Sequence, residues 1–175
     1  MRFAKACGLA LSALVLLSCV YALAQHKMSE VKANPAFDKI KTLSGDWEGT
    51  FGEGGQTMPT SVKVTIVSDG SAVMHDLAPG TKYEMITMFH PDGADVLATH
   101  YCARHNQPRM KLVPSNDLNV LVFEFMDGTN IGPGDGHMQS VKITFVDADH
   151  HYEDWSDLDH GKVTTARFDF HRKKA

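Results

Sequence analysis

The 175-residue chain is long enough for one domain, and its formal net charge of −4 predicts a mildly acidic surface. Such a surface argues against nucleic acid and anionic membranes as partners. Of three cysteines, two lie in the apolar N-terminal segment, so Cys102 stands alone in the rest of the chain. This pattern excludes an internal disulfide from the domain itself.

The first 24 residues have the pattern of a secretory signal peptide. A basic start is followed by an almost wholly apolar segment at 6–24, which ends in the small-x-small sequence Ala22-Leu23-Ala24. We therefore expect cleavage after this sequence, export to the periplasm or the outside of the cell, and no integral membrane span afterwards. Two alternatives stay open. One is lipidation at Cys19 in a loose bacterial lipobox, and the other is retention of the segment as an anchor.

A short helix is predicted after a polar, flexible leader at 25–33. Asn34 is a favourable N-cap residue, and Pro35 fits the first helical position. Phe37 and Ile40 then fall on one face, which would pack against the rest of the domain.

From position 46 onward, hydrophobic residues recur with period two, and turn residues follow every eight to twelve positions. Strands are predicted at 46–52, 60–68, 71–78, 82–90, 94–102, 108–114, 118–126, 138–147, 150–157 and 162–171. No connection has room for a crossover helix, so the strands form an up-and-down meander. Closure removes exposed edges. The prediction for 34–175 is thus an all-β domain, a single antiparallel barrel of about ten strands with a short N-terminal helix.

The sequence Gly45-Asp46-Trp47-Glu48-Gly49, after a short helix, resembles the start of calycin barrels, which include the lipocalins. It also resembles the opening of nitrobindin-like haem barrels. Together with the Thr-His-Tyr-Cys and Asn-Gln-Pro-Arg sequences within 99–109, it is most similar to an uncharacterised family of exported, lipocalin-like bacterial proteins. The resemblance implies structural roles for Gly45 and for Trp47, which would pack across the closed barrel end. It also implies that a basic side chain of the last strand, Arg167 or Arg172, covers the tryptophan.

The central segment at 99–110 concentrates polar residues that need partners or a ligand. His100 and Cys102 are two positions apart on one strand, so they share a face, and His105 follows in the turn. Three interpretations stay open: a buried polar network, a cluster that orients a ligand, or three corners of a zinc site completed by a residue such as His75.

Binding of a small, mainly apolar molecule inside the barrel, without turnover, is the predicted function. The expected binding residues are His100, Arg109 and His75 as polar anchors, Tyr83, Met85 and Phe123 as walls, and Cys102 and His105 nearby. No cofactor and no particular oligomeric state are predicted.

Two other functions are kept as alternatives. A haem protein would need a histidine facing a wide apolar cavity, with His137, His160 and His171 as candidates. A small hydrolase or isomerase would use Cys102 with His100, although no known thiol-hydrolase motif surrounds the cysteine. The acidic, histidine-rich segment at 147–160 is interpreted as a solvated strand edge, with a surface metal as the alternative.

Overall fold

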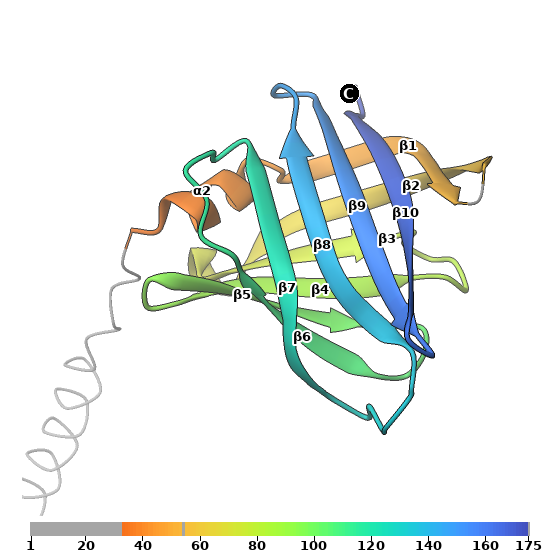
Figure 1. Cartoon of the computed structure of the whole chain (residues 1–175). Helices are drawn as coiled ribbons and strands as arrows, with labels where there is room; N and C mark the ends of the chain where they lie inside the picture. Colours follow the sequence, from red (N-terminus) through yellow and green to blue (C-terminus); the bar gives the residue numbers. More distant parts are fainter. Residues whose placement is uncertain (1–32, 54, 175) are drawn as a thin grey trace, which may run out of the picture. The chain divides into compact units, whose positions relative to one another are not determined.

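The computed structural model describes residues 33–53 and 55–174, which form a closed, ten-stranded antiparallel barrel preceded by a short helix (Figure 1). The predicted signal peptide, the lipidation site Cys19 and nearly all of the predicted leader lie outside the described residues. No helix in the described ranges is long and apolar enough to cross a membrane.

Every strand pairs with its neighbours in the chain, and β1 also pairs with β10 to close the barrel. The helix is α2 (Pro35–Lys41), and a 3-10 turn at Ser68–Gly70 joins two of the strands. The strands are β1 (Gly45–Glu53), β2 (Gln56–Val67), β3 (Ala72–Leu77), β4 (Met85–Asp92), β5 (Asp95–Tyr101), β6 (Gln107–Leu112), β7 (Val120–Thr129), β8 (His137–Phe145), β9 (His150–Asp159) and β10 (Lys162–Arg172). The predicted fold class, an up-and-down barrel of about ten strands with a short helix, is confirmed.

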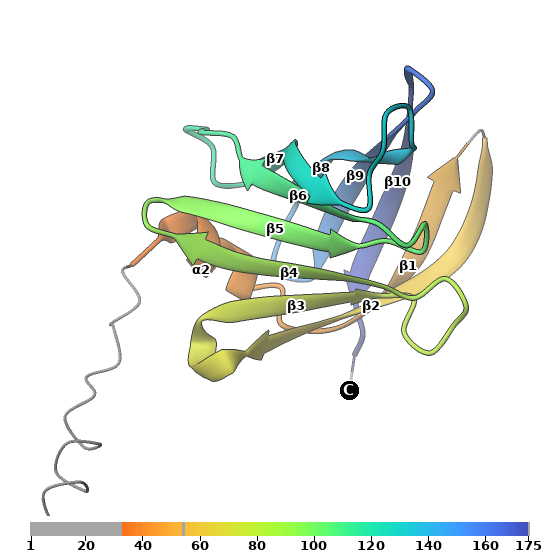
Figure 2. The same cartoon turned by 90° about the horizontal axis from the view of Figure 1, so that it is seen from below.

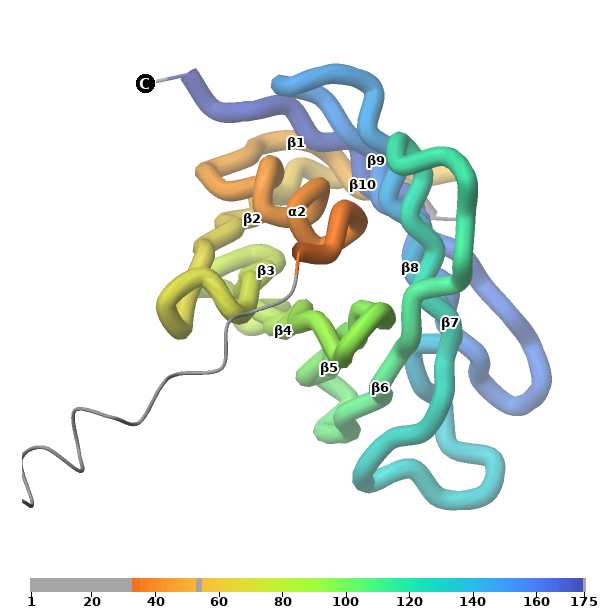
Figure 3. The backbone as a smooth tube through the Cα atoms, turned by 90° about the vertical axis from the view of Figure 1, so that its left-hand side faces the viewer, coloured from red at the N-terminus to blue at the C-terminus, as the bar shows by residue number. Residues whose placement is uncertain are grey.

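Helix α2 covers one end of the barrel (Figure 3). Asn34 caps it, since its side-chain oxygen accepts a hydrogen bond from the Phe37 amide at 3.1 Å. Phe37 and Ile40 are fully buried and join the core beneath the helix. The Asn34 amide also donates to the carbonyls of Ala94 and Asp95, which ties the helix to the β4–β5 turn.

Trp47 packs inside this sealed end, and Arg172 covers it. The guanidinium carbon lies 4.1 Å from the centre of the indole ring, and the indole nitrogen donates to the Leu43 carbonyl at 2.7 Å. Gly45 leaves room for the arginine, because a β carbon there would lie 2.7 Å from Arg172 Nη1. The assignment of Arg167 to this role is wrong: it lies on the outer face, over the ring of Tyr152.

The opposite end of the barrel is formed by the β1–β2 hairpin and the turn between β3 and β4 (Figure 2). Strand direction defines the two ends, since β4 begins at Met85 near this turn and finishes at Asp92 beside α2. Apolar residues fill the sealed half, where Phe89 packs on Phe123 with ring centres 5.3 Å apart. The other half is hollow and holds the candidate site.

Candidate functional site

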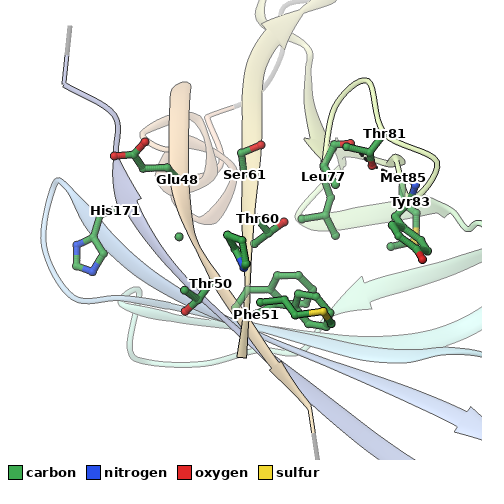
Figure 4. A pocket seen from close by; sticks show the side chains of 15 residues that line it. Glu48, Thr50, Phe51, Thr60, Ser61, Leu77, Thr81, Tyr83, Met85 and His171 are labelled. Carbon is green, nitrogen blue, oxygen red and sulfur yellow. Dashed lines mark hydrogen bonds between the residues drawn. The ribbon is translucent and has the colours of Figure 1, made fainter. Parts of the chain in front are cut away.

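Two adjoining cavities lie at the hollow half of the barrel, and the lining of the larger one also includes outward-facing residues of β1 and β10, among them Glu48 and His171. The larger, which we call the vestibule, has a volume of about 1120 Å³ (Figure 4). The smaller, which we call the deep cavity, has a volume of about 310 Å³. Leu77, Met85 and Phe168 line both, so the two spaces adjoin along these side chains.

The deep cavity is lined by side chains from strands β5 and β9 that face the barrel interior. His100 and Cys102 come from β5 and the residue after it, and Trp155 comes from β9. The indole of Trp155 lies against the His100 imidazole, with ring centres 5.0 Å apart. Ala166 on β10, which pairs directly with Trp155, adds a small side chain to the lining.

His100 has one nitrogen in a hydrogen bond and one without a partner. Its Nδ1 lies 2.9 Å from Thr87 Oγ1 on β4, whereas its Nε2 is buried and has no hydrogen-bond partner among the described residues. Burial, and then the charge of His75, lower the pKa of His100 from 6.5 to about 4. The imidazole is therefore neutral at pH 7, and its Nε2 can donate to or accept from a molecule in the cavity.

Beyond His100, a polar layer made by His75, His151, Glu153 and Trp155 crosses the barrel interior. Glu153 Oε1 accepts hydrogen bonds from His75 Nε2 and His151 Nε2, each at 3.0 Å. Its Oε2 accepts a third from the indole nitrogen of Trp155 at 2.8 Å. The carboxylate is thus held by three strong donors in a water-poor interior.

The charges of the polar layer follow from these contacts. Burial alone would raise the pKa of Glu153, but the charge of His75 and the imidazole hydrogen bonds outweigh burial and hold it far below its usual range. Burial likewise lowers the pKa of His75, but the Glu153 charge and hydrogen bond raise it overall. Glu153 is therefore ionised at pH 7, and its charge favours the protonated form of His75.

The interpretation of 147–160 as a solvated strand edge is wrong, because three of its residues are buried and β9 is not an edge strand. His151, Glu153 and Trp155 alternate along β9 and are 0%, 1% and 4% exposed. The barrel is closed, so β9 has no free edge. The missed signal was the period-two spacing of these three residues, in which a tryptophan marks the buried face.

The other predicted binding residues fall into three places. Met85 lines both cavities, and Tyr83 lines the vestibule while remaining 63% exposed. His75 belongs to the polar layer, and Phe123 packs in the sealed core.

Arg109 lies outside the barrel, which is a correction to its predicted role as an interior anchor. Its guanidinium makes two hydrogen bonds, both 2.5 Å long, to the carboxylate of Asp127 on β7. Strand alternation explains the direction, since its neighbour Met110 is fully buried. His105 lies in the exposed turn between β5 and β6 and lines neither cavity.

The central segment does not assemble a metal or a thiolate site. Within 33–53 and 55–174, His100, Cys102 and His105 are not among the ligand groups that converge as a metal site would require. Burial raises the pKa of the Cys102 thiol, although the backbone and Arg104 partly oppose it. The thiol is therefore protonated at neutral pH.

The three haem candidates also have other partners. His137 stacks near Phe125, with ring centres 4.2 Å apart, and its Nδ1 donates to the Met138 carbonyl. His160 is exposed, and His171 lies at the vestibule but stacks on His150. None of the three offers a buried, unpaired nitrogen to the wide cavity, so these three histidines do not fit the role of a haem ligand.

Comparisons with known proteins support the fold. No family model and no curated protein sequence matches the chain. A crystal structure of Rv2717c from M. tuberculosis is similar with a TM-score of 0.59 and 12% identity, covering 82% of this chain and 100% of that one. A protein of unknown function from the DUF3598 family of Nostoc punctiforme is similar with a TM-score of 0.54 and 13% identity, covering 77% of this chain. This chain spans about half of the Nostoc protein, 48% of its length. At these identities the likeness shows the barrel fold alone.

Proposed function

We propose that the protein binds a small, mainly apolar molecule inside the barrel, with a polar group of that molecule held by His100. The observation that supports this most directly is the unpaired, buried Nε2 of a neutral imidazole in the lining of a cavity. Buried polar atoms almost always have partners, so a ligand or ordered water is the expected partner here.

The vestibule suits the apolar part of such a molecule. Phe51, Leu77, Met85 and Phe168 present aromatic and aliphatic surface to it. Apolar walls with a few directed polar groups are typical of small-molecule sites. Methionine adapts to irregular apolar shapes, which favours Met85 as a contact at the junction of the cavities.

A neutral polar group, such as a hydroxyl, fits the deep cavity better than a carboxylate. Of the described residues that line it, the charged ones are Arg104 and Asp157, and these pair with each other at 2.7 Å. Arg104 also lies 3.5 Å from Asp159. A carboxylate would meet a neutral His100 and an arginine already engaged by acids, so its burial would be costly.

The state of Cys102 supports carriage or sequestration over turnover that depends on this thiol. A hydrolase or isomerase would need a thiolate at Cys102, and burial raises the pKa of that thiol. We also propose that the protein is exported and that it is related to the calycin superfamily. Both proposals rest on the sequence patterns.

Native mass spectrometry of the freshly purified, tag-free protein tests the proposal. We expect an apolar molecule of a few hundred daltons to remain bound, whereas haem or zinc would appear as its own characteristic mass. Titration with the fluorescent probe N-phenyl-1-naphthylamine then measures binding. Ala166→Phe should fill the deep cavity and weaken binding, whereas Tyr101→Phe, on the outer face beside His100, should not.

The proposal fails if the native protein contains no ligand and binds no probe. It also fails if Ala166→Phe folds and binds the probe as tightly as the unmodified chain.

A further inference from the structure

Two histidines and an aspartate converge on the outer face of the barrel, away from the polar layer. His150 lies on β9, and Asp169 and His171 lie on β10, with His150 directly opposite His171. The Nε2 atoms of His150 and His171 lie 2.9 Å and 3.4 Å from the same oxygen, Asp169 Oδ1. The two rings stack with centres 4.2 Å apart and planes 17° from parallel.

The spacing of these three atoms matches that of ligands around a metal ion. Zinc binds imidazole nitrogen and carboxylate oxygen at about 2.0 to 2.2 Å with tetrahedral angles, so neighbouring ligand atoms lie about 3.3 Å apart. The ligand atoms of His150, Asp169 and His171 all lie within 4.8 Å of one another. An ion could therefore enter between them with small side-chain adjustments and without backbone movement.

We propose that His150, Asp169 and His171 form a binding site for a divalent first-row transition metal ion, with Zn²⁺ as its representative. Two imidazoles and one carboxylate are the ligand types that such ions prefer, whereas Ca²⁺ and Mg²⁺ prefer sites made only of oxygen. The site does not rest on the proposed function, since none of its residues lines the deep cavity, although His171 also lies along the vestibule.

Glu48 lies on the neighbouring strand, but among the described residues it is not one of the ligand groups that converge. It lies directly opposite His171 across the β1–β10 pair, so its side chain leaves the sheet on the same outer face. Glu48 and His171 both lie along the vestibule, on the same side of the view in Figure 4. The three converging ligands come from two adjacent strands, β9 and β10, whose ladder fixes their spacing.

The alternative role for the cluster is a hydrogen-bonded pair that only supports the sheet. In that case both Nε2 atoms carry protons and donate to Asp169. In the metal site both Nε2 atoms must instead be free of protons, because they bind the ion. The two roles therefore differ in a directly measurable way, which is saturable binding of Zn²⁺.

Isothermal titration with ZnCl₂ at pH 7.5 tests the site, using full-length protein made without a histidine tag and stripped with EDTA. We expect one ion per chain. His150→Ala/His171→Ala should weaken binding by at least about 100-fold, and Asp169→Asn by at least about 10-fold, because removing ligands should cost no less than removing their outer-shell partners. The matched control, His105→Asn/His160→Asn, removes two exposed histidines elsewhere and should bind as the unmodified chain does.

A second readout uses Co²⁺, whose visible absorption reports coordination by nitrogen and oxygen ligands. The spectrum should appear in the unmodified chain and the control, and should be lost in His150→Ala/His171→Ala. The proposal is overturned if the unmodified chain binds neither ion saturably. It is equally overturned if the two double variants, both folded by circular dichroism, bind Zn²⁺ with the same affinity.

Discussion

His75 on β3 and Glu153 on β9 meet inside the barrel, with Nε2 and Oε1 3.0 Å apart and 78 residues between them in the chain. Their strands are not neighbours in the sheet, so this contact spans the interior. The His75–Glu153 contact lies between the sealed apolar half and the two cavities. The same carboxylate also holds Trp155, whose ring faces His100 in the deep cavity. The buried His75–Glu153 pair is thus connected through Trp155 to the lining of the deep cavity.

Replacing Glu153 with Gln should destabilise the fold by about 3 kcal/mol, since breaking a buried pair leaves an uncompensated partner. The new amide would place N–H donors against the donors of His75, His151 or Trp155. Asp154→Asn is the matched control, because Asp154 is the next residue and pairs with Arg167 on the outer face. We expect that control to cost at most about 1 kcal/mol. Urea unfolding measures both, and equal losses would contradict the central role of Glu153.

Stability should fall in mild acid because of His100. Its pKa is about 4 in the folded state and near 6.5 in the unfolded chain. Between these two pH values, the unfolded state binds a proton at His100 that the folded state does not bind. Between pH 6.5 and 5 this should cost about 2 kcal/mol. Glu153, with its depressed pKa, affects stability only at lower pH, and His75, with its raised pKa, loses its contribution as pH rises above 6.5.

His100→Gln isolates this effect. Glutamine can keep a hydrogen bond to Thr87 but does not titrate, so the loss between pH 6.5 and 5 should shrink by about 2 kcal/mol. Urea unfolding at the two pH values gives the difference, and His105→Asn, an exposed histidine, serves as the control. A variant whose stability falls as steeply as that of the unmodified chain would show that His100 is not the titrating group.

Arg172 should matter more to stability than Arg167, although both lie on β10. Arg172 donates to the carbonyls of Ser44 at 2.8 Å and Thr42 at 3.0 Å, near the end of α2, and covers Trp47. Arg172→Met should cost about 2 kcal/mol through these hydrogen bonds and the lost cation–π contact. Arg167→Met removes an outer-face pair and should cost at most about 1 kcal/mol. Thermal unfolding compares them, and the reverse order would refute the capping role.

Closure of the barrel should depend on the absence of a side chain at Gly49. A β carbon there would overlap the carbonyl oxygen of Asp169 on β10, so Gly49→Ala should force the closing strands apart. We expect a loss of about 3 kcal/mol. Gly52→Ala, also in β1, meets its nearest atom at 3.4 Å and should be tolerated. Urea unfolding followed by circular dichroism measures the stability of both variants. Equal losses of unfolding free energy would contradict the prediction.

Local sequence patterns were sufficient to predict the barrel but not the full interior. Alternation such as Val62 and Val64 against Lys63 marks each strand by itself, and short turns leave only neighbouring pairings. Which polar side chains face inward is harder to predict, because burial of Glu153 depends on partners from a distant strand. Local propensity places such a residue outside.

Arg109 is the reverse case: it was predicted to face the interior, but it lies on the outer face. The dense polar composition of the central segment suggested an anchor, although its neighbour Met110 already indicated the inward face. Its partner Asp127 lies on the next strand, and only the observed register brings the two together. Ala166 likewise lines the cavity beside His100, although no local pattern marks it as a wall.

Trp155 should report on the chemical class of the ligand. The chain has two tryptophans, and Trp47→Phe leaves Trp155, in the deep cavity, as the only one. Because the His100 site is neutral, dodecanol should change Trp155 emission at a concentration at least about tenfold lower than dodecanoate does at pH 7, a difference of about 1.4 kcal/mol. Adding His100→Phe should remove that preference while leaving apolar binding in the vestibule. Tighter binding of dodecanoate would instead mean that Arg104 releases Asp157 to receive a carboxylate, and a neutral polar group would no longer be the favoured ligand chemistry.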